Sequence, residues 1–532
     1  MPMIAGRSYS LGLASVVMAG SILLSRLMGL VRDKVIAYHF GATLESDVYF
    51  AAFVVPDFIN YLLAGGYFAI TLIPLLSERF TLDEADGWRF FSAVLTWITI
   101  AIVALTLAGE IFAPQLAGVV APGFAPEDQA RLARFLRIIL PAQVFFLTGS
   151  CFTALLYLRK QFLVPALAPL LYNAGIILGG LAMLDHGMEG FCWGVLAGSL
   201  AGNLLFPLLA AAGQGGSAPG APSGIRYVPR LSHPALRTFV LLALPLMIGQ
   251  SVVVLDEQLL RVFGSLAEEG AVSWLNYARR IMLVPVGVVA QAAGVASYPF
   301  LAGLAARGAD AEFVGTLSSA LRNTAAVIVP VSVWMLLAAP ETVGLIFMQG
   351  RFGTADLTVT ALCLRVMLLG VFLWGVQQVL GRAFYARKDT LTPSLAGTGA
   401  TLAALPVYWL LGKAYGAAGL AAASLASVAL YTAAMAVIWR RRHGSEAFSG
   451  LARTLGASAA VALASLPPAA LARWAVGRLP LPYHLEAFTA LCASGVVFVV
   501  VFVLLARQMA PQVAAPFESA LQRVRARMRP GG

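Results

Sequence analysis

Four arginines lie inside stretches that are otherwise apolar enough to cross a membrane: Arg26, Arg32, Arg261 and Arg280. An arginine at the centre of a membrane helix costs about 2.5–3.5 kcal/mol on the insertion scale, so all four would cost roughly 10 kcal/mol if they faced lipid. We therefore expect them to line a wet cavity. The guanidinium group is a planar fork of donors that suits phosphate oxygens, which predicts an anionic, phosphorylated substrate.

The surroundings of the first two arginines allow two interpretations. Gly29 lies between Arg26 and Arg32, and Ser25 and Asp33 flank them. This pattern predicts a local break in the helix with ion pairing. In the other interpretation, both arginines belong to a shorter first helix and extend to the membrane interface without a specific role.

Acidic side chains are also present on the second and seventh apolar stretches: Asp47, Asp57, Asp256 and Glu257. Asp47 fits the outer end of its helix. Asp256 and Glu257 either pair with Arg261 or Arg280 or bind a coupling cation, and the sequence favours neither role.

The amino-acid composition indicates the environment in which these charged residues lie. Of the 532 residues, 60% are hydrophobic and 11% are charged, and the mean hydropathy is +0.83. This leaves too little polar surface for a soluble chain of that length. No stretch alternates apolar and polar residues as a membrane β-strand does, so we expect an all-α integral membrane protein.

About 20 apolar residues are needed to cross the bilayer core, and about fourteen stretches qualify as transmembrane helices. Those at 10–39 and 47–77 are long enough to be tilted or broken. The predicted spans are 10–39, 47–77, 88–118, 129–158, 162–184, 190–212, 235–263, 271–301, 312–338, 355–386, 391–412, 417–440, 450–473 and 486–507.

Two similar phrases reveal an internal duplication: Leu156-Tyr-Leu-Arg-Lys-Gln-Phe-Leu-Val-Pro165 and Phe384-Tyr-Ala-Arg-Lys-Asp-Thr-Leu-Thr-Pro393. Each repeat holds six helices, an even number, so the two copies are parallel repeats that would form two lobes with a cleft between them. The predicted parts are an N-lobe at 1–212, a cytoplasmic linker at 213–234, a C-lobe at 235–442, two additional helices at 443–510 and a basic tail at 511–532. The polar stretch 213–229 within this linker is rich in glycine and proline and is expected to be flexible.

The basic residues alternate between loops, which predicts the orientation. Lysine and arginine gather in the even-numbered loops and the tail, so both termini are expected in the cytoplasm. The net charge of +11 follows from this topology and forms no single patch for nucleic acid. The glycines at every fourth position from Gly190 to Gly202 favour close helix packing over substrate contact.

Enzyme chemistry is not indicated. The four cysteines lie in or beside apolar stretches without metal-like spacing, the five histidines have no evident catalytic partner, and no Walker A pattern is present. We expect a transporter with no cofactor or metal, coupled to the membrane potential or to a monovalent cation. Two negative charges moving outward across 100 mV gain roughly 4–5 kcal/mol, so no ATPase is required.

Several segments in order resemble the MurJ (MviN) lipid II flippases of the multidrug, oligosaccharidyl-lipid and polysaccharide exporter superfamily. The resemblance covers about residues 8–445. Its segments are Ser25-Arg-Leu-Met-Gly-Leu-Val-Arg-Asp33, Phe40-Gly-Ala42, Ser46-Asp47, Ala121-Pro-Gly-Phe124, Ala271-Val-Ser-Trp274, Tyr277-Ala278, Phe384-Tyr-Ala-Arg-Lys-Asp389 and Thr392-Pro393.

The resemblance implies a V-shaped bundle of fourteen helices with a central cationic cavity in a bacterial inner membrane. It implies that the chain moves undecaprenyl-diphosphate-linked peptidoglycan precursor (lipid II) outward by alternating access, in contact with membrane lipids and with other cell-wall synthesis proteins. The residues expected to bind substrate are Arg26, Arg32, Arg280, Arg261, Asp47, Ser25, Gly29 and Asp33, with Asp256 and Glu257 as candidates for ion coupling or ion pairing.

The chain departs from the family pattern at four positions. Asn60 and Gly65 stand where the family often has an arginine and a glutamate, Arg279 replaces an acidic residue, and Leu283 replaces a polar or acidic one. These departures leave open a flippase for another polyprenyl-linked glycan, such as an O-antigen or exopolysaccharide unit. A cation-coupled multidrug exporter is the weaker alternative, because arginines outnumber acids on the first span.

Overall fold

The computed structural model describes residues 11–63, 67–213, 225–251 and 255–518, and these residues form α-helices, short 3₁₀ and π segments and no β-strand. They divide into two compact units, Met1–Val272 and Ser273–Gly532. The predicted all-α class is therefore confirmed. Gly65, residues 214–224 of the linker and residues 519–532 of the tail lie outside the described residues.

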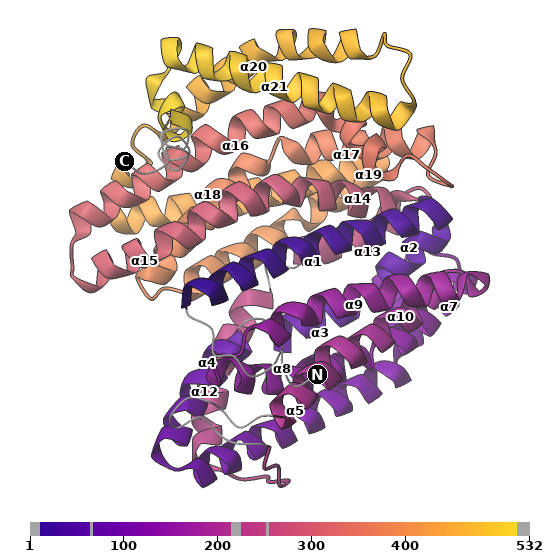
Figure 1. Ribbon diagram of the computed structural model, residues 1–532, viewed down its shortest axis with the longest axis vertical. Helices are drawn as coiled ribbons and strands as arrows, with labels where there is room; N and C mark the ends of the chain where they lie inside the picture. The colour runs from indigo at the N-terminus through magenta and orange to yellow at the C-terminus, as the bar shows by residue number, and fades with distance from the viewer. Residues whose placement is uncertain (1–10, 64–66, 214–224, 252–254, 519–532) are drawn as a thin grey trace, which may run out of the picture. The chain divides into compact units, whose positions relative to one another are not determined.

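The first unit contains the first seven predicted spans. Its second span comprises α2, α3 and α4, with a break between α2 and α3, whereas α1 is one continuous helix (Figure 1). Its elements are α1 (Leu11–Phe40), α2 (Leu44–Ala51), α3 (Val54–Leu63), α4 (Tyr67–Leu82), α5 (Glu84–Ile111), α6 (Ala113–Val120), α7 (Pro126–Ile139), α8 (Ala142–Leu158), α9 (Leu163–Ala182), η1 (Leu184–His186), α10 (Glu189–Ser199), η2 (Leu200–Leu205), α11 (Phe206–Ala212), α12 (Pro234–Ser251) and α13 (Leu255–Gly264).

The second unit contains the remaining seven predicted spans. Two of them, 391–412 and 417–440, form α19, which is interrupted at Gly416 by a non-helical backbone conformation (φ 56°, ψ −137°). The elements are α14 (Ala271–Pro285), which begins at the unit boundary, η4 (Val286–Gln291), α15 (Ala292–Ala306), α16 (Asp310–Phe347), α17 (Thr354–Leu368), α18 (Val371–Ala386), α19 (Leu391–His443), η5 (Glu446–Phe448), α20 (Leu451–Val476) and α21 (Tyr483–Met509).

Every one of the fourteen predicted spans coincides with helix in the described residues. Within the part of the chain that the structure describes, nine helical stretches are long and apolar enough to cross a membrane, and the bent pair α17 and α18 makes a tenth. The chain is thus a multi-pass membrane protein. The predicted spans 10–39, 47–77 and 235–263 are helical over their described residues but are not among these stretches.

The duplicated phrases form the same turn in both units. In each, the helix and its C-cap residue are followed by a lysine with a positive φ, 56° at Lys160 and 62° at Lys388. The amides of Gln161 and Asp389 then close the turn by donating to the carbonyls of Leu156 (2.8 Å) and Phe384 (3.0 Å). This is the hydrogen-bond pattern of a Schellman helix end, so the sequence repeat is also a structural repeat.

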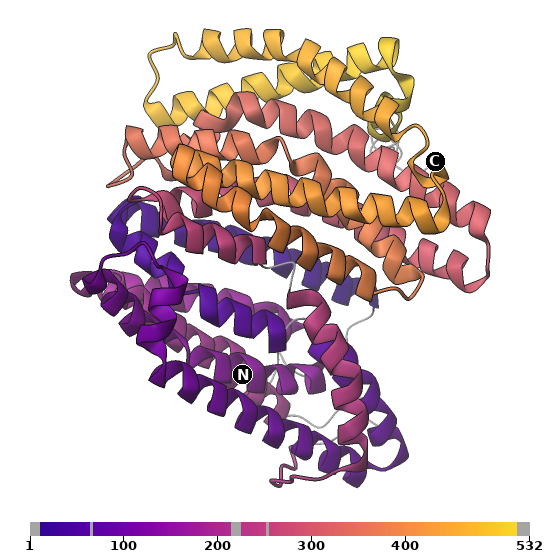
Figure 2. The same cartoon turned by 180° about the vertical axis from the view of Figure 1, so that it is seen from behind.

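The glycines predicted to pack do so. In α10, Gly194 and Gly198 face Gly179 and Gly175 of α9, and a Cβ atom built on Gly179 would lie 2.5 Å from the Cα of Gly194. No side chain fits between backbones at that separation, which is the reason for glycine at these positions. The two helices run side by side in both views (Figures 1 and 2).

The described end of the linker is docked, contrary to the flexibility expected of it. The indole of Trp97 on α5 donates to the carbonyl of Leu231 (2.8 Å). Thr96 of the same helix contacts the Tyr227 hydroxyl (3.1 Å) and accepts from the Arg230 amide (3.4 Å). Because α5 offers side-chain partners along one face, residues 225–233 follow it as an ordered strap.

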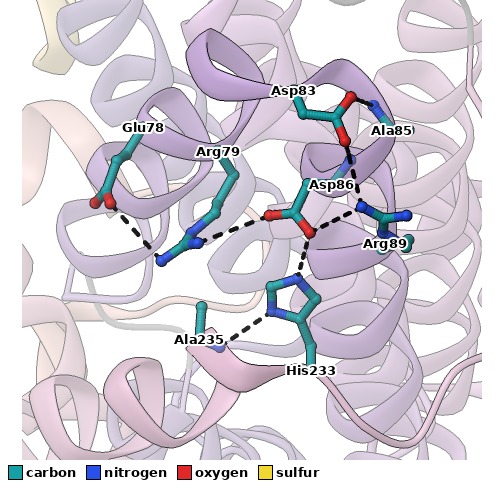
Figure 3. A network of polar contacts seen from close by, with 8 residues as sticks. All are labelled: Glu78, Arg79, Asp83, Ala85, Asp86, Arg89, His233 and Ala235. Carbon is teal, nitrogen blue, oxygen red and sulfur yellow. Dashed lines mark hydrogen bonds and ion pairs between the residues drawn. The ribbon is translucent and has the colours of Figure 1, made fainter.

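A polar network attaches the start of α12 to α4 and α5 (Figure 3). The Nδ1 atom of His233 accepts from the Ala235 amide (3.1 Å), and its Nε2 atom lies 3.3 Å from Asp86. Asp86 also pairs with Arg89 (3.2 Å) and Arg79 (3.7 Å). Consequently α12, which the sequence assigns to the second lobe, packs on α3, α4 and α5 of the first unit.

In the second unit, α20 and α21 pack on each other and on α16, and their helices lie side by side in Figures 1 and 2. The first part of the predicted tail continues this packing. Val513 and Ala514 are buried in the same core as Phe502, and Glu518 pairs with Arg507 (2.9 Å). Residues 511–518 are therefore a helical part of the second unit.

Candidate functional site

The first unit holds a buried ion pair on α1 that is hydrogen-bonded to α9. The Arg32 guanidinium donates from Nε and Nη2 to one carboxylate oxygen of Asp33 (2.9 and 2.8 Å) and from Nη1 to the side-chain oxygen of Asn173 (3.5 Å). The Asp33 side chain is fully buried and that of Arg32 is 11% exposed. Arg32 is thus held inside the unit by Asp33 and Asn173.

Arg26 has a different environment from Arg32. Its side chain is exposed, as are those of Leu23 and Leu27, and Ser25 is half-buried. The expected break at Gly29 is wrong, because α1 continues through it as regular helix. No atom lies within 4 Å of a Cβ built on Gly29, so the helix needs no glycine there for packing.

A second cluster of charges joins α3 to α13. Arg261 is 5% exposed and donates to Asp57 (2.7 Å), Glu257 (2.8 Å) and Gln258 (3.2 Å). Of the two interpretations of Glu257, ion pairing is the geometry that the structure shows. Asp256 is also buried, and its role as a coupling residue stays a prediction. The sequence places Asp57 among the acidic residues of the second apolar stretch but assigns it no partner and does not include it among the predicted site residues.

The Asp47 carboxylate holds a backbone amide close to the start of α14. The side chain of Asp47 is buried, and one carboxylate oxygen accepts from the amide of Gly270 (2.8 Å), whose φ is 90°. Asp47 lies in the first turn of α2, as expected for the outer end of a helix, where a carboxylate is favoured by the helix dipole. It connects the start of α2 with the residues that precede α14.

In the second unit, two neighbouring arginines occupy the middle of α14. Arg279 is 7% exposed, and its guanidinium carbon lies 5.8 Å from the ring centre of Trp374 on α18. Such an arrangement is an attractive cation–π contact. Arg280 and Leu283 are half-buried. The departure at position 279 therefore places a cation in the interior of the second unit, with an aromatic ring against it.

The helices and their buried charges define a class of protein, a multi-pass membrane transporter of two helical units. Buried arginines held by carboxylates inside membrane helices are costly, and such groups mark transport pathways.

Comparison with known proteins gives the family. The lipid II flippase MurJ family matches residues 36–485. The lipid II flippase MurJ of Burkholderia cenocepacia is 27% identical over 399 residues, covering 71% of this chain and 74% of that protein. A probable lipid II flippase MurJ of Buchnera aphidicola is 26% identical over 394 residues, covering 70% and 73%. The chain belongs to the lipid II flippase MurJ family.

Solved structures share the fold. A lipid II flippase MurJ in an inward closed conformation has a TM-score of 0.77 at 21% identity, covering 93% of this chain and 99% of that one. An inward-facing multidrug resistance MATE family transporter of the MOP superfamily has a TM-score of 0.67 at 15% identity, covering 84% and 98%. The family match begins at residue 36, so Arg280 lies within it, whereas Arg26 and Arg32 precede it.

Proposed function

We propose that this chain moves lipid II from the inner to the outer leaflet of a bacterial inner membrane. The observation that carries this function is the family match over residues 36–485. The buried arginine clusters support it, because guanidinium groups are suited to the diphosphate of such a lipid. Transport by alternating access, with both termini in the cytoplasm, belongs to the same proposal.

The ion pairs affect how a diphosphate could bind. Arg32 and Arg261 are already held by carboxylates in the first unit, so a diphosphate must share their remaining donors or replace a carboxylate. Such an exchange keeps the guanidinium groups paired in both the empty and the loaded states. It thereby avoids the several kcal/mol that an uncompensated buried charge costs.

The membrane potential is a sufficient driving force. A diphosphate with about two negative charges gains roughly 4–5 kcal/mol for each 100 mV when it leaves a negative interior, if its charges cross uncompensated. Coupling to a monovalent cation is the alternative source of energy, and Asp256 is its candidate ligand in this chain.

The test is complementation in spheroplasts depleted of their own flippase, with outward exposure of lipid II as the readout. We expect the wild type to restore exposure, Arg26→Ala, Arg32→Ala and Arg280→Ala to reduce it at least tenfold, and Arg32→Lys to restore little because it lacks the donor fork. Arg453→Ala is the matched control, since Arg453 is an exposed arginine on α20. Failure of the well-expressed wild type would refute lipid II as substrate, and full activity of all the alanine variants would refute the role of the arginines.

A further inference from the structure

A small cavity in the first unit has a lining unlike that of a phosphate site. Its volume is about 330 Å³, and residues from α3, α7, α8, α9 and α10 line it, with Phe53 just before α3. This volume is at the lower end of the roughly 300–1,000 Å³ of small-molecule sites. The lining residues are Phe53, Asp57, Asn60, Tyr61, Ile139, Gln143, Phe146, Tyr172 and Val195.

Aromatic rings form much of the wall. The rings of Phe146 and Tyr172 meet edge to face with their centres 5.2 Å apart. The ring of Phe53 packs edge to face against that of Tyr49, with the two ring centres 5.1 Å apart. Tyr61 is 45% exposed and lies at the rim. Aromatic faces carry partial negative charge, and they attract the C–H groups on the face of a sugar ring.

The polar groups of the lining are two side-chain amides, one carboxylate and the hydroxyls of Tyr61 and Tyr172. Gln143 is 5% exposed, and within the described residues neither its side-chain amide nor that of Asn60 has a hydrogen-bond partner. Asp57 is 31% exposed in its side chain and already bonds Arg261 (2.7 Å). The lining therefore has little net charge and offers both donors and acceptors, which suits neutral hydroxyl and acetamido groups better than phosphate.

The cavity adjoins the Arg32 cluster through α9. Tyr172 lines the cavity, and the next residue, Asn173, accepts from Arg32. A sugar that is esterified to a diphosphate requires this pair of sites, one cationic and one neutral, next to each other.

We propose that the cavity binds the sugar ring next to the diphosphate of the lipid-linked glycan, with the amides of Asn60 and Gln143 bonding its hydroxyl or acetamido groups. This proposal rests on the proposed function. It names the part of the substrate that the first unit recognises and makes Asn60 and Gln143 specificity-determining residues.

The experiment measures binding by the full chain in nanodiscs, with tryptophan fluorescence as the readout. The two probes are lipid II and undecaprenyl diphosphate, which lacks the sugars. We expect the wild type to bind lipid II at least ten times more tightly. Gln143→Leu and Asn60→Leu should each lose threefold to tenfold in affinity for lipid II, as expected for one lost hydrogen bond, and keep their affinity for undecaprenyl diphosphate. Gln508→Leu, at an exposed glutamine on α21, should behave as the wild type.

Tyr61→Leu is the variant for the case in which the buried substitutions do not fold, because its rim position tolerates change, and it should also lose affinity for lipid II only. The cavity proposal is wrong if folded variants keep the full preference for lipid II. It is equally wrong if they change the sodium dependence of binding in place of that preference, which would indicate a cation site. Failure of the wild type to bind lipid II at all would instead contradict the proposed function.

Discussion

The ion pairs of Arg261 predict a specific pattern of stability. Its buried guanidinium contacts Asp57 on α3 and Glu257 on its own helix, at 2.7 and 2.8 Å. Asp57→Asn or Glu257→Gln alone removes one charged contact while the other carboxylate stays in place. Hydrogen bonds to charged groups contribute about 1.5–3 kcal/mol. Since Glu257 and Asp57 are partly exposed, at 24% and 31%, we expect about 1.5 kcal/mol for each single variant.

The double variant is expected to cost more than the sum of the two. It neutralises both carboxylates while the arginine keeps its charge, and breaking a buried pair in this way costs about 3–5 kcal/mol. The excess over additivity, about 1–2 kcal/mol at the upper end of that range, is the coupling that a double-mutant cycle measures. Adding Arg261→Met should recover most of the loss, because it removes the buried charge and retains an apolar side chain of similar length.

Unfolding can be followed with a thiol-reactive dye in detergent. Cys151, Cys192 and Cys363 are buried and become reactive when the chain unfolds, while exposed Cys492 is replaced by serine in every variant. One kcal/mol corresponds to about 2–4 °C in the thermal midpoint for a unit of this size. A double variant within 2 °C of the wild type, or no recovery on adding Arg261→Met, would refute this account of Arg261.

The same variants distinguish pairing from cation coupling at Glu257. If Glu257 only pairs with Arg261, the Glu257→Gln variant should transport with the same dependence on cation concentration as the wild type. Its expression level should be unchanged or lower. A change in sodium or proton dependence would contradict the pairing role and assign Glu257 to coupling.

Three further outcomes are expected. Gly194→Ala should lower the thermal midpoint by a few degrees, since its Cβ would lie 2.7 Å from a backbone oxygen of α9; Gly303→Ala, with no atom within 4 Å of the new Cβ, should leave the midpoint unchanged or raise it. Lys388→Gly should stabilise the chain by about 0.5–1 kcal/mol, because an L-residue at φ 62° is strained; a lower midpoint would contradict this. Trp97→Phe removes the donor that holds the strap and should speed trypsin cleavage after Arg230 severalfold, and an unchanged rate would show that other contacts suffice.

Much of the fold follows from the sequence because its signals are local. A run of about 20 apolar residues specifies a membrane helix whatever surrounds it, and all fourteen predicted spans are helical in the described residues. The repeated phrases predicted an internal duplication, and they form the same turn in both units because a Schellman end depends on a few consecutive residues. The glycines of α10 also predicted close packing against a neighbouring helix, because glycine has no side chain to keep the two helix backbones apart.

The tertiary structure decided which charges are partners. Asp57 and Arg261 are more than 200 residues apart, and no spacing rule relates them until α13 packs on α3. The strap on α5 likewise depends on hydrogen bonds between distant residues, and these bonds hold residues 225–229, which the sequence predicted to be flexible. Composition and periodicity determine that helices form and cross a membrane, whereas the packing of those helices determines which buried polar groups meet, because each must find its partner from wherever the fold supplies one.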